Sequence, residues 1–156
     1  MGLYGHHKSI AQGATLVPCS DMCGTIVAVG SSVSRTWRTG QRVVSLSNQT
    51  HLTGQITEEH MAAGLGLPLP GVLSEYRVFP SYGLIEVPEY LTDEEASTLP
   101  IAAVTAWMSI NGMNPIGQHV RGRDKTVLLQ GTGGVSIAGL QIAHASGMTC
   151  MMIRYP

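Results

Sequence analysis

The sequence predicts an α/β protein, and three observations support this prediction. Short apolar runs bounded by glycine and other turn residues fill the first half of the chain, which is typical of β-strands. After residue 88 the spacing of apolar residues becomes that of helices. Near its end the chain has a strand pattern, a glycine-rich turn, a helix pattern and a second strand pattern. The predicted organisation is therefore a β-rich part at 1–88 and an α/β part at 89–156.

The β-rich part contains four segments with β-branched and other apolar residues. They are predicted as strands at 24–30, 40–46, 71–79 and 82–88. Between the second and third strands lies a loop-rich insertion at 47–70. It holds one predicted helical turn, for which Thr57 is the N-cap. The prolines of 64–71 exclude a regular helix from that stretch.

The second part begins with a helix-start signal. Thr92 precedes three consecutive carboxylates, which stabilise the positive end of a helix. Pro100 either interrupts this helix or begins a second one. The final βαβ order is predicted from a strand at 126–130, a helix at 137–145 and a strand at 149–153. Gly147 is the predicted stop of that helix.

Composition excludes several classes of function. Charged residues make up only 12% of the chain and the formal net charge is −1, so no basic surface for nucleic acid is expected. No apolar run is long enough to span a membrane, and no secretory signal is visible. Three cysteines cannot all pair, which favours free thiols in a reducing cytoplasm. The Cys19–Cys23 spacing lacks the second ligand pair of a zinc site, and His6 and His7 are expected to be solvated.

The glycine-rich turn at 131–136 carries the chemistry. Gly131 permits a sharp turn out of the strand, and Gly133 lets backbone amides approach a pyrophosphate without a Cβ in the way. A helix that begins near Gly134 directs free N–H groups towards the phosphates. Ser136 stands at the third motif position, where Gly or Ala is usual, and is small enough to be tolerated. The alternative is an ordinary strand-to-helix turn that binds no ligand.

The end of the second strand bears on which dinucleotide would bind. No acidic residue for a ribose hydroxyl stands about 20 residues after the first glycine. Arg154 is the charged residue there, which favours a 2′-phosphate and hence NADP, with NAD as the other option. The alternative is that Arg154 is simply an exposed arginine.

Several motifs occur in a fixed order and carry a family resemblance. They are Pro18–Gly24, Val27–Gly30, Gly40–Val43, Gly71–Tyr76, Glu95–Pro100, Val104–Trp107 and Gly131–Ser136. The chain resembles the medium-chain dehydrogenase/reductase superfamily over residues 16–153. Within the superfamily it is similar to the zinc-independent quinone-oxidoreductase-like branch and its fungal alcohol-dehydrogenase-like relatives.

The resemblance implies a partial GroES-like β-barrel followed by an incomplete Rossmann βαβ unit. It implies hydride transfer between a nicotinamide cofactor and a small carbonyl, enone or alcohol. By position, the residues that would line the pyrophosphate are Gly131, Thr132, Gly133, Gly134 and Val135. Thr105 would approach the nicotinamide, or alternatively its hydroxyl bonds back to a helix carbonyl.

The resemblance also implies that no zinc is bound. Zinc-bearing members have His-Glu where this chain has Ser20 and Asp21, and Cys where it has Ile101. Asp21 is instead expected to pair with an arginine such as Arg42. Cys19 and Cys23 are expected to be small packing residues.

No proton donor follows from the motifs. By side-chain chemistry the candidates are Tyr76, Tyr82 and Asn48, and a structural role is the alternative for each.

The chain is short for this family, so a truncated form is expected, with part of the cofactor site missing and activity uncertain. The strands at 126–130 and 149–153 would lack neighbours on at least one edge, which invites pairing with another copy or with a homologue. A non-catalytic remnant that acts as a binding or interaction module is the alternative function.

Overall fold

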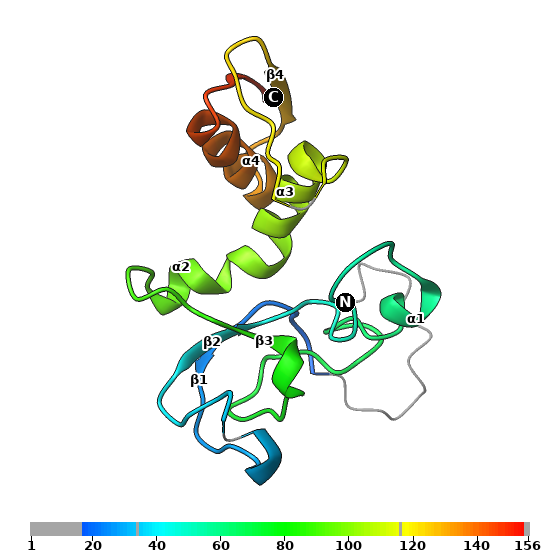
Figure 1. Cartoon of the computed structure of the whole chain (residues 1–156), viewed down its shortest axis with the longest axis vertical. Helices are drawn as coiled ribbons and strands as arrows, with labels where there is room; N and C mark the ends of the chain where they lie inside the picture. Colours follow the sequence, from blue (N-terminus) through cyan, green and yellow to red (C-terminus); the bar gives the residue numbers. More distant parts are fainter. Residues whose placement is uncertain (1–16, 34, 116, 155–156) are drawn as a thin grey trace. The chain divides into compact units, whose positions relative to one another are not determined.

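The computed structural model describes residues 17–33, 35–115 and 117–154. The chain divides into two compact units, Met1–Glu89 and Tyr90–Pro156. Figure 1 shows the chain as a ribbon, coloured from blue near the N-terminus to red near the C-terminus. His6 and His7, for which solvated positions are predicted, lie outside the described residues.

The first unit is built on a three-stranded antiparallel sheet. Its strands β1 (Cys23–Thr25), β2 (Arg42–Ser45) and β3 (Leu84–Glu86) lie in the order β1-β2-β3. Gly24 pairs with Val43. Three of the four predicted strands are therefore confirmed in place, but each is shorter than predicted. Val43 and Ser45 are buried at the centre of this sheet.

The fourth predicted strand, 71–79, is wrong: the structure contains no strand there. Its first residues instead donate backbone hydrogen bonds to an irregular segment, with Gly71 N–H on the Val17 carbonyl at 2.6 Å and Val72 N–H on the Pro18 carbonyl at 3.0 Å. An apolar run alone does not make a strand. A strand also needs a partner along its length, and no described segment pairs with 75–79.

Short helical pieces complete the first unit. The 3₁₀ turns η2 (Ser31–Val33) and η3 (Ser81–Gly83) flank the sheet, and α1 (Glu58–Met61) lies in the insertion. The predicted cap of α1 is confirmed, because the Thr57 side chain accepts from the His60 N–H. His60 completes a capping box by accepting the Thr57 N–H on its Nδ1.

The second unit opens with three consecutive helical segments, α2 (Asp93–Ser97), the π-helical η4 (Leu99–Ala103) and α3 (Val104–Asn111). The predicted cap is confirmed: Thr92 Oγ1 accepts the Glu95 N–H, and the Glu95 carboxylate accepts the Thr92 N–H. Pro100 lies in the first turn of η4, where its missing N–H costs nothing. It therefore begins a new helical segment, which runs directly into α3.

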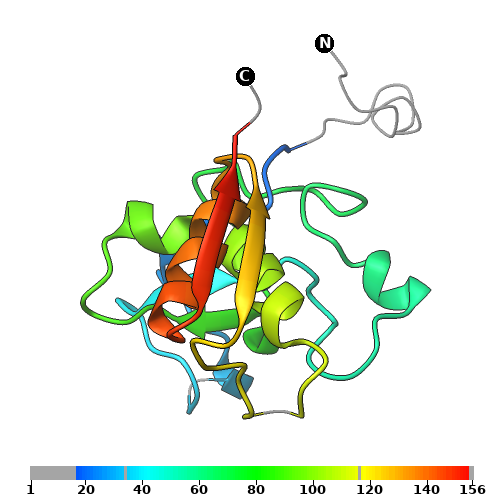
Figure 2. The same ribbon diagram turned by 90° about the horizontal axis from the view of Figure 1, so that it is seen from above.

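The predicted βαβ unit is confirmed. Strands β4 (Thr126–Gln130) and β5 (Thr149–Ile153) are parallel and are joined by α4 (Gly134–Ala145). Figure 2 shows the two arrows side by side with α4 behind them. Gly147 ends α4 with φ at +75°. The N–H groups of Gly147 and Met148 bond to the carbonyls of His144 and Ala143, which is the Schellman arrangement.

Only one face of this two-stranded sheet is covered. Towards α4 the side chains of Val127 and Leu129 are half-buried, and Ala143 of α4 is completely buried. On the other face Leu128 and Met151, which are register partners, are each 56% exposed. The strand predicted at 126–130 is therefore covered on the face towards α4, and its other face is exposed. Among the described residues β4 and β5 have no further neighbours, as expected for strands with open edges.

No helix within the described part of the chain has the length and apolar character needed to cross a bilayer.

Candidate functional site

The glycine turn between β4 and α4 has the backbone shape that the motif predicts. Gly131 has φ at +76°, a left-handed conformation that favours glycine, and its N–H donates to the Ile153 carbonyl at 2.7 Å. Gly133 is extended and is the N-cap of α4. A Cβ added at Gly131 or at Gly133 would have no heavy atom within 4 Å. The space in front of both glycines is therefore open.

The first turn of α4 has no cap of its own. Gly133 offers no side chain, and no side-chain hydrogen bond caps the helix. The Ile137 N–H donates to the Gly133 carbonyl at 3.0 Å. The N–H groups of Gly134, Val135 and Ser136 precede that bond in the chain, so they are the donors that a helix start presents to an acceptor. These donors and the positive end of the helix dipole favour an anion.

The outer side of the turn is accessible. Thr132 is exposed and Val135 is 42% exposed. Arg154 is also exposed and directly follows Ile153, whose carbonyl accepts the Gly131 N–H. Arg154 therefore lies at the carboxyl ends of the two parallel strands, where the glycine turn also lies.

Thr105 lies at the start of α3, directly after η4, and η4 contacts the start of α4. A Cβ added at Gly134 would be 3.2 Å from the Cβ of Ala102, three residues before Thr105. Thr105 is exposed on α3, and its carbonyl accepts the Ser109 hydroxyl at 2.8 Å. The structure thus brings η4, which runs directly into α3 and Thr105, to the start of α4.

Sequence reasoning missed Gly139, in the middle of α4. A Cβ there would lie 3.0 Å from Leu129 Cδ2 and 3.8 Å from the Cβ of Ala106. Gly139 therefore permits α4 to approach both β4 and α3 closely. The available signal was a lone glycine inside an otherwise helical pattern, where glycine is unfavourable unless packing requires it.

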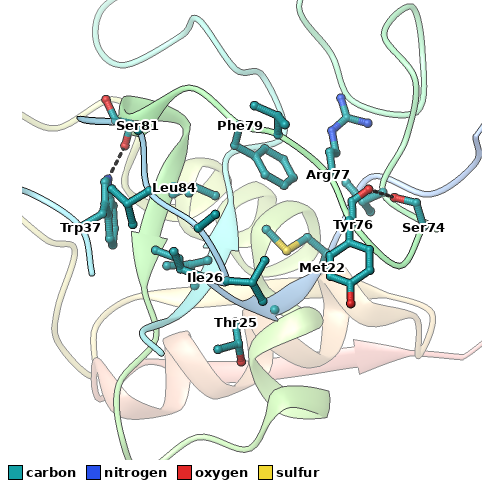
Figure 3. Close-up of a pocket in the computed structure, with 18 of the residues that line it drawn as sticks. Met22, Thr25, Ile26, Trp37, Ser74, Tyr76, Arg77, Phe79, Ser81 and Leu84 are labelled. Atoms are coloured by element: carbon teal, nitrogen blue, oxygen red, sulfur yellow. Dashed lines mark hydrogen bonds between the residues drawn. The ribbon is translucent and has the colours of Figure 1, made fainter. Parts of the chain in front are cut away.

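The first unit contains an apolar cavity of about 520 Å³. Figure 3 shows Met22, Ile26 and Phe79 among its lining side chains, with the ring of Tyr76 beside Met22. Trp37 also lines it and donates its indole N–H to the Ser81 carbonyl at 2.9 Å.

The three predicted proton donors differ in whether they line this cavity. Tyr76 lines it and is 75% exposed. Tyr82, in η3, is 54% exposed and does not line the cavity. Asn48 also lies outside the lining and forms a β-bridge with Gly64. Of the three, Tyr76 is therefore the one that lines this cavity.

Arg77 fixes one wall of this cavity. Its Nη1 donates to the carbonyls of Pro70 and Gly71, and its guanidinium lies over the Phe79 ring at 5.3 Å from the centroid. Burial lowers the pKa of Arg77. These contacts assign Arg77 to holding the 70–79 segment in shape.

The predictions about metal and cysteines concern residues near β1. Within the described ranges no three His, Cys, Asp or Glu residues are grouped as a metal would require. The Ser20 hydroxyl donates to the Asp21 carboxylate at 2.7 Å, and the proposed Asp21–Arg42 pair stays a prediction. All three cysteines are free; Cys19 is exposed, while Cys23 and Cys150 are half-buried.

Residues 2–89 match the family model of the alcohol dehydrogenase GroES-like domain. The chain belongs to this family. The match covers the first unit, so the β1-β2-β3 sheet is part of a GroES-like domain.

Individual relatives extend the match across the second unit. The chain is 39% identical over 132 residues to the zinc-type alcohol dehydrogenase-like protein C1773.06c of Schizosaccharomyces pombe. It is 40% identical, with a TM-score of 0.80, to a crystal structure from Sinorhizobium meliloti 1021 to which an alcohol dehydrogenase activity is attributed. It is 25% identical, with a TM-score of 0.63, to mycobacterial Rv1454c, solved in complex with NADPH.

These matches cover most of this chain but less than half of each relative. The shares are 85% of the chain and 37% of the S. pombe protein, 94% and 42% for the S. meliloti structure, and 96% and 38% for Rv1454c. The chain is thus a member of the medium-chain dehydrogenase/reductase superfamily that spans about two fifths of such relatives. Its fold is a partial GroES-like unit followed by the βαβ part of a Rossmann unit, as the resemblance implied.

Proposed function

We propose that this chain carries the diphosphate-binding part of an NAD(P)H-dependent oxidoreductase that transfers hydride to or from a small carbonyl, enone or alcohol. NADP is the cofactor we favour, and NAD is the second option. The observation that carries the proposal is the open, uncapped start of α4 behind Gly131 and Gly133.

The residues of the turn fit a dinucleotide. A diphosphate needs backbone donors that it can approach closely, and both glycines leave that approach free of side-chain atoms. Thr132, Gly134 and Val135 complete the stretch of backbone that would surround it. Rv1454c, which shares this fold, is described as complexed with NADPH, and another relative is named an NAD(P)H oxidoreductase.

Two further residues have proposed roles at the ends of the cofactor. Arg154, exposed at the edge where the glycine turn lies, would meet a 2′-phosphate. Thr105 would face the nicotinamide end from α3. The nicotinamide ring, when bound, would donate or accept the hydride, and this chain's residues would bind and orient the cofactor.

Substrate chemistry is proposed from the relatives' names, which include alcohol dehydrogenases, a trans-enoyl reductase and quinone oxidoreductase homologues. Among the predicted proton donors Tyr76 is the first that we would substitute in an activity assay, because it lines the cavity of the first unit. No partner beyond a small molecule is proposed for catalysis. A cytoplasmic location stays a prediction, since some relatives are named as chloroplastic or mitochondrial.

Calorimetric titration with NADPH and NADH tests the proposal directly. We expect binding of both, tighter for NADPH, and we expect Arg154→Gln to weaken NADPH without changing NADH. Hydride-transfer assays with a quinone and an aldehyde then test turnover. Binding without turnover would favour the non-catalytic binding module. If neither nucleotide binds, the proposed function of this chain is wrong.

A further inference from the structure

The Ser136 hydroxyl makes a hydrogen bond that no motif requires. It donates to the carbonyl of Gln130 at 2.7 Å. Gln130 is the last residue of β4, and Ser136 is the third residue of α4. The bond therefore joins the strand to the helix across the whole glycine turn.

This bond matters because the turn has few other restraints. Gly131 and Gly133 have no side chains, and glycine loses more conformational freedom on folding than any other residue. The Gly131 N–H is tied to β5 through the Ile153 carbonyl at 2.7 Å. The Ser136 bond ties the other end of the turn, where α4 begins. Glycine or alanine at this position could not make it.

We propose that Ser136 is a positioning residue, which holds the turn in the shape that receives a diphosphate by bonding to the Gln130 carbonyl. The backbone amides of the turn are then already oriented towards the ligand before it binds, so less conformational entropy is lost on binding. A hydroxyl has one hydrogen to donate, and that of Ser136 goes to the Gln130 carbonyl. Ser136 therefore acts on the shape of the turn and does not donate to the phosphate. The inference rests on the proposed function and deepens it.

The test compares Ser136→Ala with Ser136→Thr in the full chain, using calorimetry with NADPH, NADH and inorganic pyrophosphate. We expect Ser136→Ala to weaken all three by a similar factor, between about twofold and tenfold, because one hydrogen bond that orders the shared diphosphate site is lost. Threonine keeps the hydroxyl and should restore most of the affinity. Unchanged affinity in Ser136→Ala, or a gain, would overturn the proposal.

Ser97→Ala is the matched control. The Ser97 hydroxyl also donates to a backbone carbonyl, that of Glu94 at 2.8 Å, but in α2. Its loss should leave all three affinities unchanged, and an equal loss in both variants would show a general stability effect instead of positioning.

A readout that needs no ligand separates this inference from the proposed function. Order parameters from NMR relaxation at the Gly131–Gly134 amides should fall in Ser136→Ala and stay at parent values in Ser97→Ala. Unchanged order at the turn refutes the positioning role, whatever the titrations show. If the parent binds no nucleotide while the turn loosens as expected, the proposed function fails and the role of Ser136 in shaping the turn stands.

Discussion

Gly71 in the first unit and Gly133 in the second unit serve opposite purposes. In the first unit a Cβ added at Gly71 would lie 2.1 Å from the carbonyl oxygens of both Pro18 and Cys19. In the second unit a Cβ added at Gly133 would meet no heavy atom within 4 Å. One glycine is required because the protein's own backbone fills the space, and the other leaves space that the protein does not fill. The difference distinguishes a packing glycine from a candidate ligand-binding one.

The largest expected effect is that of Gly71→Ala on the first unit. The Cβ would overlap backbone atoms, which cannot move aside as a flexible side chain can, so we expect a loss of about 3 kcal/mol or more in the free energy of unfolding. Urea unfolding followed by Trp37 fluorescence, in a Trp107→Phe background, reports this unit. Gly30→Ala is the control, because a Cβ there meets nothing within 4 Å. If Gly71→Ala and Gly30→Ala have the same free energy of unfolding, Gly71 is not required by the packing of the backbone around it.

Gly133→Ala should separate binding from stability. Its φ of −77° suits alanine and its surroundings are open, so we expect the free energy of unfolding to be unchanged or higher by about 0.5 kcal/mol. NADPH affinity should fall at least about tenfold, because a methyl group enters the space proposed for the diphosphate. Calorimetry and urea unfolding monitored at Trp107 give the two values. Equal affinity in parent and variant would remove Gly133 from the proposed site.

Gly139→Ala should have an intermediate effect and refine the comparison. Here the nearest atom is Leu129 Cδ2, at 3.0 Å, the end of a side chain that can shift. We expect a loss of about 1 kcal/mol, since crowding outweighs the better helix propensity of alanine. Shortening the neighbour in Gly139→Ala/Leu129→Val should recover most of that loss. A purely additive double variant in urea unfolding would show that this contact does not limit the approach of α4 to β4.

The smallest expected effect is electrostatic, in the loop before β4. The side-chain hydrogen bond from Lys125 to Asp124, with Nζ 3.0 Å from Oδ2, lowers the pKa of the Asp124 carboxyl. A lowered pKa means that any stabilisation is present above the unfolded-state pKa and is lost as pH falls through the folded-state pKa. Lys125→Met should raise the Asp124 pKa towards its ordinary value in an NMR titration. An unchanged titration curve would show that Lys125 is not the cause.

Local signals predicted much of the fold. The N-caps at Thr57 and Thr92 and the stop at Gly147 were all predicted correctly, because each depends on hydrogen bonds or dihedral angles within a few residues. Whether Pro100 interrupts a helix or begins a second one was left open by the sequence. The strand predicted at 71–79 was wrong for the converse reason. Pairing is a property of two segments, and an apolar run cannot reveal whether a partner lies beside it.

The candidate site likewise has features that the sequence predicted and features that it did not. The residues of the glycine turn were predicted from their order in the chain, and their role in binding stays a prediction. Gly139 was not predicted, because its role depends on how closely α4 approaches β4. The bond from Ser136 was not predicted because only the small size of serine was considered at that position.

By itself the sequence determined the helix caps at Thr57 and Thr92, the stop at Gly147, the βαβ order and the glycine turn. Only the tertiary structure decided which glycine faces backbone and which faces open space. The physical reason is that caps and turns are settled among neighbours in the chain. Free space depends on atoms brought together from distant segments.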